Sequence, residues 1–156
     1  MRLALTIFAM AFTLACSNKA PAPECLIDAA YKSDKQANAG CFIHDNGKLL
    51  VIRQRINSKL STPGGTNKTG ETAQCTAHRE TWEEAGVNVV VGRELHVFSN
   101  EFYLYECSIT NTKTPLHSND LIEVSEVLWV DPRDTLKTNW RYSDQYALII
   151  ELLDAQ

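Results

Sequence analysis

The apolar positions of the central chain fall into short runs that predict β-strands. Gly40–Ile43 and Lys48–Ile52 are two such runs, and Asp45-Asn46-Gly47 lies between them. An Asn-Gly pair favours the tight turn of a hairpin, because both residue types tolerate positive φ. These residues therefore predict two antiparallel strands.

Later segments rich in β-branched and aromatic residues predict further strands. They are Val87–Val91, Leu95–Phe98, Phe102–Ile109 and Ile122–Val130. The segments Arg53–Thr69 and Asn111–Asp120 are expected to be loops. The first of them contains glycines, which let backbone approach a ligand closely.

Two segments have helical character. From Thr69 to Ala85 only Gly70 interrupts a run free of Gly and Pro, and Gly86 follows as the expected C-cap. Ser143 is the expected N-cap of a final helix. Its apolar face comprises Tyr146, Ile149, Ile150 and Leu153. This pattern alone predicts an α/β or α+β protein with a mixed sheet between two helices.

The amino terminus has the pattern of an export signal. Arg2 precedes an uncharged run of 13 residues, Leu3 to Ala15, which is too short to span a bilayer but has the length of a secretory signal core. The run ends at Cys16 in a sequence that resembles a bacterial lipoprotein cleavage site, and Ser17 favours sorting to the outer membrane. We therefore expect a periplasmic protein anchored to the outer membrane by a lipid on Cys16, with a soluble periplasmic form as the alternative.

This signal divides the chain into three parts. Residues 1–15 are the expected signal peptide. Residues 16–24 are the expected tether, because Asn18 to Pro23 contains Pro, Ala and polar residues without apolar periodicity. Residues 25–156 are enough for one domain with a single core.

Four cysteines remain after the signal, namely Cys25, Cys41, Cys75 and Cys107. They show neither CxxC nor Cys/His zinc spacing, and an even number in an exported chain favours disulfides. We expect two bridges, with all three pairings open. Cys75 lies on the predicted central helix, and Cys25 and Cys107 are both eligible partners for it. Four buried free thiols are the alternative.

Three carboxylates lie together on the predicted central helix. Glu80, Glu83 and Glu84 stand at i, i+3 and i+4, on one face and about 5–6 Å apart at Cβ. They also lie near the helix C-terminus, where the helix dipole disfavours anions. A cation such as Mg²⁺ or Mn²⁺ would relieve this repulsion through oxygen ligands, and the planar fork of Arg79 can orient carboxylates. A solvated, charged helix face is the alternative.

The stretch from Gly65 to Val87 resembles the signature of the Nudix hydrolase family, G-x5-E-x7-R-E-U-x-E-E-x-G-U, in which U is apolar. The matched positions are Gly65, Glu71, Arg79, Glu80, Glu83, Glu84, Gly86 and Val87. Thr81 departs from the signature, because it stands where the family has a large aliphatic residue. That position faces the core behind the helix, so Thr81 is expected to weaken packing and to leave the ligands intact.

The resemblance implies an α/β/α sandwich built on a small mixed sheet. It also implies hydrolysis of a diphosphate bond, with Mg²⁺ or Mn²⁺, in a nucleoside diphosphate derivative or a related organic diphosphate. The implied ligands are the carboxylates of Glu80, Glu83 and Glu84 and the carbonyl of Gly65. Glu71 and Arg79 would orient this cluster, and one carboxylate would serve as general base. A Nudix-fold lipoprotein that binds or scaffolds without catalysis is the alternative.

Some members of the family place the base outside the signature. Glu123 and Glu126, in the segment around the last predicted strand, are candidates here, with Glu123 the stronger and a surface position as the alternative for each. Arg53 and Arg55, at the end of the second strand, are candidate phosphate-binding residues. The net charge is −4 and no Lys/Arg cluster is longer than two residues, which gives little support to nucleic-acid binding. The expected partner is a small-molecule diphosphate, and the expected membrane contact is the lipid on Cys16 alone.

Overall fold

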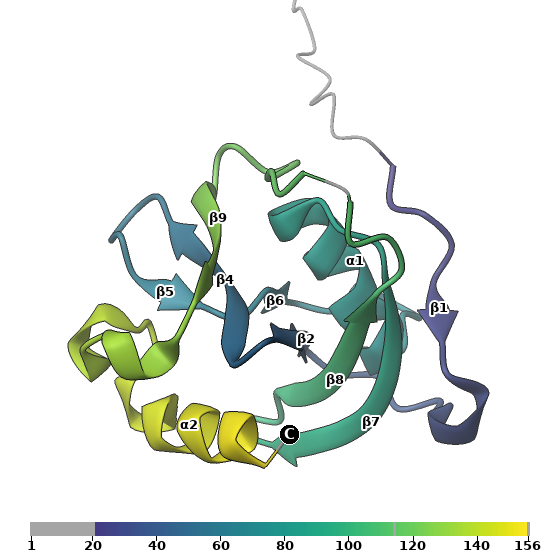
Figure 1. Cartoon of the computed structure of the whole chain (residues 1–156). Helices are drawn as coiled ribbons and strands as arrows, with labels where there is room; N and C mark the ends of the chain where they lie inside the picture. Colours follow the sequence, from purple (N-terminus) through teal and green to yellow (C-terminus); the bar gives the residue numbers. More distant parts are fainter. Residues whose placement is uncertain (1–20, 114, 156) are drawn as a thin grey trace, which may run out of the picture.

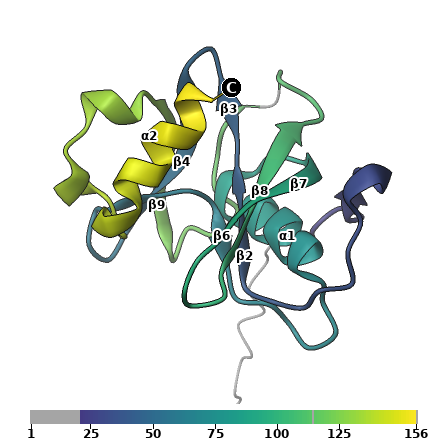
Figure 2. The ribbon, with the colours of Figure 1, turned by 90° about the horizontal axis from the view of Figure 1, so that it is seen from below.

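Two β-sheets separate two α-helices in the computed structural model, which describes residues 21–113 and 115–155. Figures 1 and 2 show the helices α1 (Ala73–Ala85) and α2 (Tyr146–Asp154) on opposite sides of the strands. Neither helix in the described part of the chain has the length and apolarity needed to cross a bilayer. The expected signal peptide and Cys16 lie outside the described residues.

The first sheet is mixed and has the strand order β1-β7-β8-β2-β6. Its strands are β1 (Leu26–Ile27), β7 (Val89–Val97), β8 (Tyr103–Ile109), β2 (Ala39–Phe42) and β6 (Gly64–Gly65). The pairs β1–β7 and β2–β8 are parallel, whereas β7–β8 and β2–β6 are antiparallel. The mixed sheet predicted from the sequence is therefore confirmed.

The second sheet is antiparallel and has β4 at its centre. Its strands are β3 (His44–Asp45), β4 (Lys48–Gln54), β5 (Leu60–Ser61) and β9 (Val124–Val130). β4 pairs with each of the other three. Short 3-10 turns cover Ala29–Tyr31, Pro132–Asp134, Lys137–Asn139 and Ser143–Gln145.

The predicted hairpin turn is confirmed, but its first strand is shorter than expected. Asn46 and Gly47 have φ of 48° and 74°, as the tight hairpin turn requires. Only the short strand β3 pairs with β4 across this turn. The preceding strand, β2, belongs to the first sheet, so the chain crosses between the sheets at Ile43.

The side chains of β4 point alternately into two layers of the core. Leu50 and Ile52 belong to the cluster that contains the apolar face of α1, and Leu49 and Val51 belong to the cluster that contains Ile149 of α2. Successive side chains of a strand point to opposite faces, so one strand serves both layers. Burying each such side chain contributes about 1.5–3 kcal/mol. The predicted α/β/α arrangement follows from this packing.

Several predicted boundaries are wrong, and the expected loop Arg53–Thr69 contains the end of β4 and the strands β5 and β6. α1 begins at Ala73 and not at Thr69, because Gly70 has φ of 81° and Thr72 accepts the N–H of Cys75 as the N-cap. Ser143 does not cap the final helix, since it starts a 3-10 turn that leads into α2.

The two strands expected between Val87 and Phe98 are one strand, β7. It remains paired with β8 through register shifts between Val91 and His96. These irregularities let one strand bend without interrupting its pairing.

The described cysteines form two disulfides, as expected. Cys25 pairs with Cys75 and Cys41 with Cys107, each pair with Cα atoms 5.5 Å apart. The first bridge attaches the segment before β1 to the first turn of α1. The second joins the adjacent strands β2 and β8 within the core.

Thr81 lies on the buried side of α1, as predicted, and its hydroxyl has no hydrogen-bond partner among the described residues. A buried polar group without a partner costs about 1–3 kcal/mol. We therefore expect Thr81→Val to raise the free energy of unfolding by about 1 kcal/mol, measured by denaturant unfolding of the whole protein.

Thr76 provides the matched control, because it is equally buried on the same helix. Its hydroxyl donates to Glu71 and to the Thr72 carbonyl, each at 3.1 Å. Thr76→Val should destabilise the protein. A loss of stability in both variants would show that the Thr81 hydroxyl is satisfied in solution.

Candidate active site

α1 carries three of the predicted ligands and is capped at both ends. Thr72 Oγ1 accepts from the N–H of Cys75 at 3.3 Å. Gly86 has φ of 68° and donates its N–H to the carbonyl of Trp82 at 3.1 Å, which confirms the predicted C-cap. The last turn and a half of this helix bears the carboxylates of Glu80, Glu83 and Glu84.

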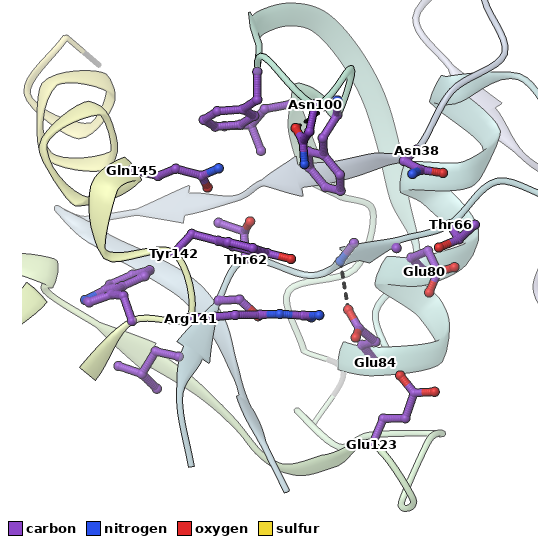
Figure 3. Close-up of a pocket in the computed structure, with 18 of the residues that line it drawn as sticks. Asn38, Thr62, Thr66, Glu80, Glu84, Asn100, Glu123, Arg141, Tyr142 and Gln145 are labelled. Atoms are coloured by element: carbon purple, nitrogen blue, oxygen red, sulfur yellow. Dashed lines mark hydrogen bonds between the residues drawn. The ribbon is translucent and has the colours of Figure 1, made fainter. Parts of the chain in front are cut away.

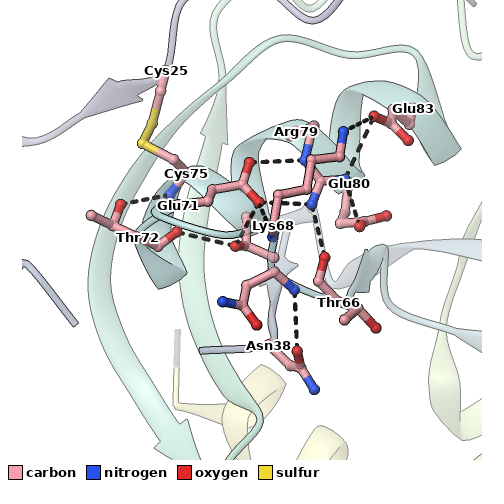
Figure 4. Close-up of polar contacts among 12 residues, drawn as sticks. Cys25, Asn38, Thr66, Lys68, Glu71, Thr72, Cys75, Arg79, Glu80 and Glu83 are labelled. Carbon is pink, nitrogen blue, oxygen red and sulfur yellow. Dashed lines mark hydrogen bonds and ion pairs between the residues drawn. A yellow bond between two sulfur atoms is a disulfide. The ribbon is translucent and has the colours of Figure 1, made fainter. Parts of the chain in front are cut away.

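Arg79 binds Glu71 through two nitrogens on one edge of its guanidinium. Nε donates to Oε1 and Nη2 to Oε2, each at 2.8 Å, and Nη2 also donates to the Thr66 carbonyl at 2.9 Å (Figure 4). Burial alone would raise the pKa of Glu71, but the bonds from Arg79 and the Lys68 amide outweigh it and the pKa is lowered. Glu71 is thus a charged partner that fixes the orientation of Arg79.

The remaining nitrogen of Arg79 reaches the cluster of acids. Nη1 donates to Glu80 Oε1 at 2.6 Å and lies 3.5 Å from Glu83 Oε1. Burial raises the pKa of Glu80; Arg79 opposes that shift, whereas the charges of Glu83 and Glu123 add to it. Arg79 therefore offsets only part of the cost of holding these anions together.

Glu84 is the most buried of the three acids on α1. It is 6% exposed, and its Oε2 accepts the N–H of Gly64 at 2.7 Å. Burial raises the pKa of Glu84 to about 8; the Gly64 bond and Arg141 oppose the shift, and Glu80 and Glu123 add to it. A buried carboxylate among other carboxylates is unfavourable unless a cation joins it.

Gly65 lies directly against one of the acids. A Cβ atom at Gly65 would stand 2.6 Å from Cδ of Glu80, a distance that real side chains do not reach. The absence of a side chain lets the main chain of β6 approach the Glu80 carboxylate. Any side chain at position 65 would therefore clash with Glu80 on α1.

The two acids considered outside the signature differ in position. Glu123 lies in the turn before β9, and its charge affects the pKa of both Glu80 and Glu84. Glu126 lies within β9 and forms an ion pair with Arg53, with Nε and Oε2 2.7 Å apart. Only Glu123 faces the same cavity as the acids of α1.

That cavity has a volume of about 390 Å³ and two chemically different ends. One end is acidic, with Glu80, Glu83, Glu84 and Glu123 beside Gly65. Figure 3 shows Asn100, Tyr142 and Gln145 away from these acids, and the rings of Phe98 and Phe102 also line the cavity. Figure 3 shows Arg141 extending across the cavity toward Glu84 and the acidic end.

The donor chemistry suits a divalent cation. Carboxylates supply only oxygen, which Mg²⁺ and Mn²⁺ prefer. Within the described ranges, no three His, Cys, Asp or Glu side chains converge as they stand on one ion position. Arg79 holds Oε1 of Glu80, so a cation would compete with it for that oxygen. The residues therefore fit a divalent ion by chemistry, with side-chain rearrangement on binding.

Comparison with known proteins identifies the family. A family model described as NUDIX domain matches residues 34–149, which is most of the chain. The chain belongs to the Nudix family. A MutT-like protein of Streptomyces ambofaciens is 30% identical over 122 residues, which cover 75% of this chain and 73% of that protein.

Solved Nudix structures share the fold. A NUDIX hydrolase from Nitrosomonas europaea has a TM-score of 0.63 and 19% identity, covering 80% of this chain and 74% of its own. An ADP-ribose pyrophosphatase from Streptococcus suis has a TM-score of 0.62 and 19% identity, covering 77% of this chain and 92% of its own. The predicted Nudix-like fold is confirmed.

The structure brings the Nudix signature residues together but places the two predicted phosphate-binding arginines elsewhere. Neither Arg53 nor Arg55 lines the cavity. Arg53 is paired with Glu126, and Arg55 donates to the carbonyls of Leu121 and Val124. Both residues follow the buried part of β4. Arg53 therefore pairs with a residue of the second sheet, and Arg55 binds the turn before β9 and the first residue of β9.

Arg141 is the arginine that the structure places at the cavity. It is the basic residue among the described residues that line the cavity. Its guanidinium forms no hydrogen bond or ion pair with another described residue and lies 5.1 Å from the centre of the Tyr142 ring. Its main-chain N–H donates to the Leu60 carbonyl at 2.8 Å, a contact between distant segments that a local pattern does not indicate.

Proposed function

We propose that this protein is an exported diphosphatase that uses Mg²⁺ to hydrolyse a phosphoanhydride bond in a nucleoside diphosphate derivative. The observation that carries the proposal is a cavity lined by Glu80, Glu83, Glu84 and Glu123 and by Arg141, whose guanidinium forms no hydrogen bond or ion pair with another described residue. Membership of the Nudix family supports the reaction class, since its enzymes act on such bonds with divalent cations.

The roles follow from position. Glu80, Glu83, Glu84 and the Gly65 carbonyl would hold Mg²⁺, or Mn²⁺ in its place. When bound, the ion supplies positive charge to the phosphate oxygens and lowers the pKa of a coordinated water.

The other charged residues of the site have separate tasks. Arg79 and Glu71 keep the acids oriented. Glu123 is the proposed general base, because its exposed side chain reaches the cavity from outside α1 and can accept a proton from the attacking water. Arg141 would bind the phosphate that lies away from the metal.

The aromatic and amide end supports a nucleoside as the non-phosphate part. Tyr142 and Phe98 offer ring faces on which a base can stack, and the amides of Asn100 and Gln145 can both donate and accept hydrogen bonds. A prenyl chain would leave these amides unpaired on binding. The cavity volume lies at the lower end of the range of about 300–1,000 Å³ for ligand pockets, which suits one nucleoside rather than two.

Export is proposed from two independent features. The segment from Arg2 to Cys16 has the composition of a bacterial lipoprotein signal. The disulfides Cys25–Cys75 and Cys41–Cys107 are stable in an oxidising compartment such as the periplasm. Labelling of cells with a radioactive fatty acid tests the anchor; no label on wild-type protein, or equal label on a Cys16→Ala variant, would refute lipidation at Cys16.

A substrate panel tests the reaction. The mature protein with Mg²⁺ should be assayed against nucleotide sugars, ADP-ribose, dinucleoside polyphosphates, nucleoside triphosphates and prenyl diphosphates. ADP-ribose is included because one similar structure is named an ADP-ribose pyrophosphatase. Turnover of a nucleoside diphosphate derivative is expected. No turnover of any compound would overturn the proposal and favour a binding module.

Arg141→Gln should raise KM for the best substrate by about 10- to 100-fold with a smaller effect on kcat. The magnitude is that of losing a hydrogen bond to a charged group. Arg93→Gln is the control, because Arg93 is also exposed but pairs with Glu106 and does not line the cavity. Equal KM values in the wild type and the Arg141 variant would show that another group binds the phosphate.

A further inference from the structure

The turn before β9 holds Glu123 at the cavity between two buried residues, Asp120 and Val124. Leu121 and Ile122, which precede Glu123, are 70% and 78% exposed. These two apolar side chains therefore contribute little to fixing the turn, which depends on its buried flanking residues and on hydrogen bonds to its main chain.

Arg55 supplies three of those hydrogen bonds. Its main-chain N–H donates to the Glu123 carbonyl at 2.8 Å. Its side chain donates from Nε to the Leu121 carbonyl at 2.8 Å and from Nη2 to the Val124 carbonyl at 3.0 Å. One planar guanidinium thus spans the turn from its first residue to the start of β9, a geometry that the single ammonium of lysine cannot reproduce.

The other side of the turn is attached to α1. Asp120 Oδ1 accepts the N–H groups of Ile122 and Glu123, at 3.1 and 3.2 Å. The adjacent Asn119 donates its main-chain N–H to the carbonyl of Glu83 and its side-chain amide to that of Trp82, each at 2.9 Å. The turn is therefore fixed between β4 on one side and the end of the helix that carries the metal ligands on the other.

We infer that Arg55 is a positioning residue that acts on the reaction through Glu123. The inference rests on the proposed function, because it requires Glu123 to take part in hydrolysis. Glu123 has an exposed side chain, so the direction in which its carboxylate points depends on the main chain of the turn. A displacement of about 1 Å in a catalytic group can reduce a rate about 100-fold.

A double-mutant cycle on kcat tests this role in the full chain. Arg55→Gln should lower kcat by about 10- to 100-fold and leave KM within about threefold. Glu123→Gln should lower kcat by at least as much. The double variant should be no slower than Glu123→Gln alone, because Arg55 has nothing further to position once the carboxylate is absent. Arg55→Lys should fall between the wild type and Arg55→Gln.

Arg53→Gln is the matched control, since the same substitution two residues earlier breaks the pair with Glu126 and leaves the turn intact. It should keep the wild-type kcat. Amide hydrogen exchange at Ile122, Glu123 and Val124 should become faster in Arg55→Gln and stay unchanged in Arg53→Gln. Equal exchange in the two variants would overturn the inference even if a lower stability reduced the activity of both.

The outcomes separate the inference from the proposed function. If Glu83→Gln abolishes hydrolysis while Glu123→Gln or Arg55→Gln retains the wild-type kcat, the positioning role falls and the diphosphatase stands. If the losses from Arg55→Gln and Glu123→Gln multiply in the double variant, Arg55 acts through another group and the inference also falls. If the wild type hydrolyses nothing, both are overturned.

Discussion

Glu84→Gln should lower kcat for Mg²⁺-dependent hydrolysis about 100- to 1,000-fold while the fold stays intact. The amide removes one negative charge and one metal-binding oxygen, and loss of a single electrostatic group in an active site costs about 10²–10³-fold. The fold should survive because the remaining amide oxygen can still accept the N–H of Gly64, at 2.7 Å from Oε2 in the structure. Removal of the charge also relieves the burial penalty that raises the pKa of Glu84.

Glu83→Gln should have a similar effect, because Glu83 lies at the same end of the cavity. Steady-state kinetics over a range of Mg²⁺ concentrations, with circular dichroism to check the fold, measures both variants. Glu126→Gln is the control, since Glu126 is exposed and paired with Arg53 outside the cavity. Wild-type turnover in both Glu83→Gln and Glu84→Gln would refute the assignment of these residues.

The parts of the site that lie on one local element could be predicted from the sequence. The spacing of Glu80, Glu83 and Glu84 fixes their common face through helix geometry alone, and Gly86 ends that helix as its conformational freedom suggests. The buried position of Thr81 followed from the resemblance to the Nudix signature, in which an apolar residue stands at this position. Local spacing is sufficient here because few residues separate the groups concerned.

Features that depend on distant contacts could not be predicted in this way. Arg55 and Arg141 each lie next to apolar residues, and this local pattern does not show which of them faces the cavity. Arg141 reaches the cavity because Trp140 bridges to Leu60 across 80 positions of sequence, which brings the segment before α2 beside β5. Arg55 lies beside the turn before β9 because β9 pairs with β4. Pairing between strands, rather than composition, decided which arginine faces the cavity.

The Cys41–Cys107 disulfide should be the largest single contributor to stability among the bonds described. Its loop spans a sequence separation of 66, for which loss of the bridge costs about 4 kcal/mol through the entropy of the unfolded chain. Both cysteines are also buried, at 0% and 4% exposure, between the strands that support α1. The double variant Cys41→Ala/Cys107→Ala should therefore lower the melting temperature by about 10–20 °C.

The second disulfide provides the comparison for this prediction. Cys25–Cys75 closes a loop of similar length, with a separation of 50, so chain entropy alone predicts nearly equal losses for the two bridges. Cys25 and Cys75 are only partly buried, so their replacement by alanine leaves less unfilled space in the core. Scanning calorimetry of both double variants should show the larger loss for Cys41→Ala/Cys107→Ala.

The difference in burial also predicts a difference in reduction. A mild reductant should open Cys25–Cys75 in the folded protein and leave Cys41–Cys107 closed. Reduction of both bridges at equal rates would contradict the burial of Cys41–Cys107.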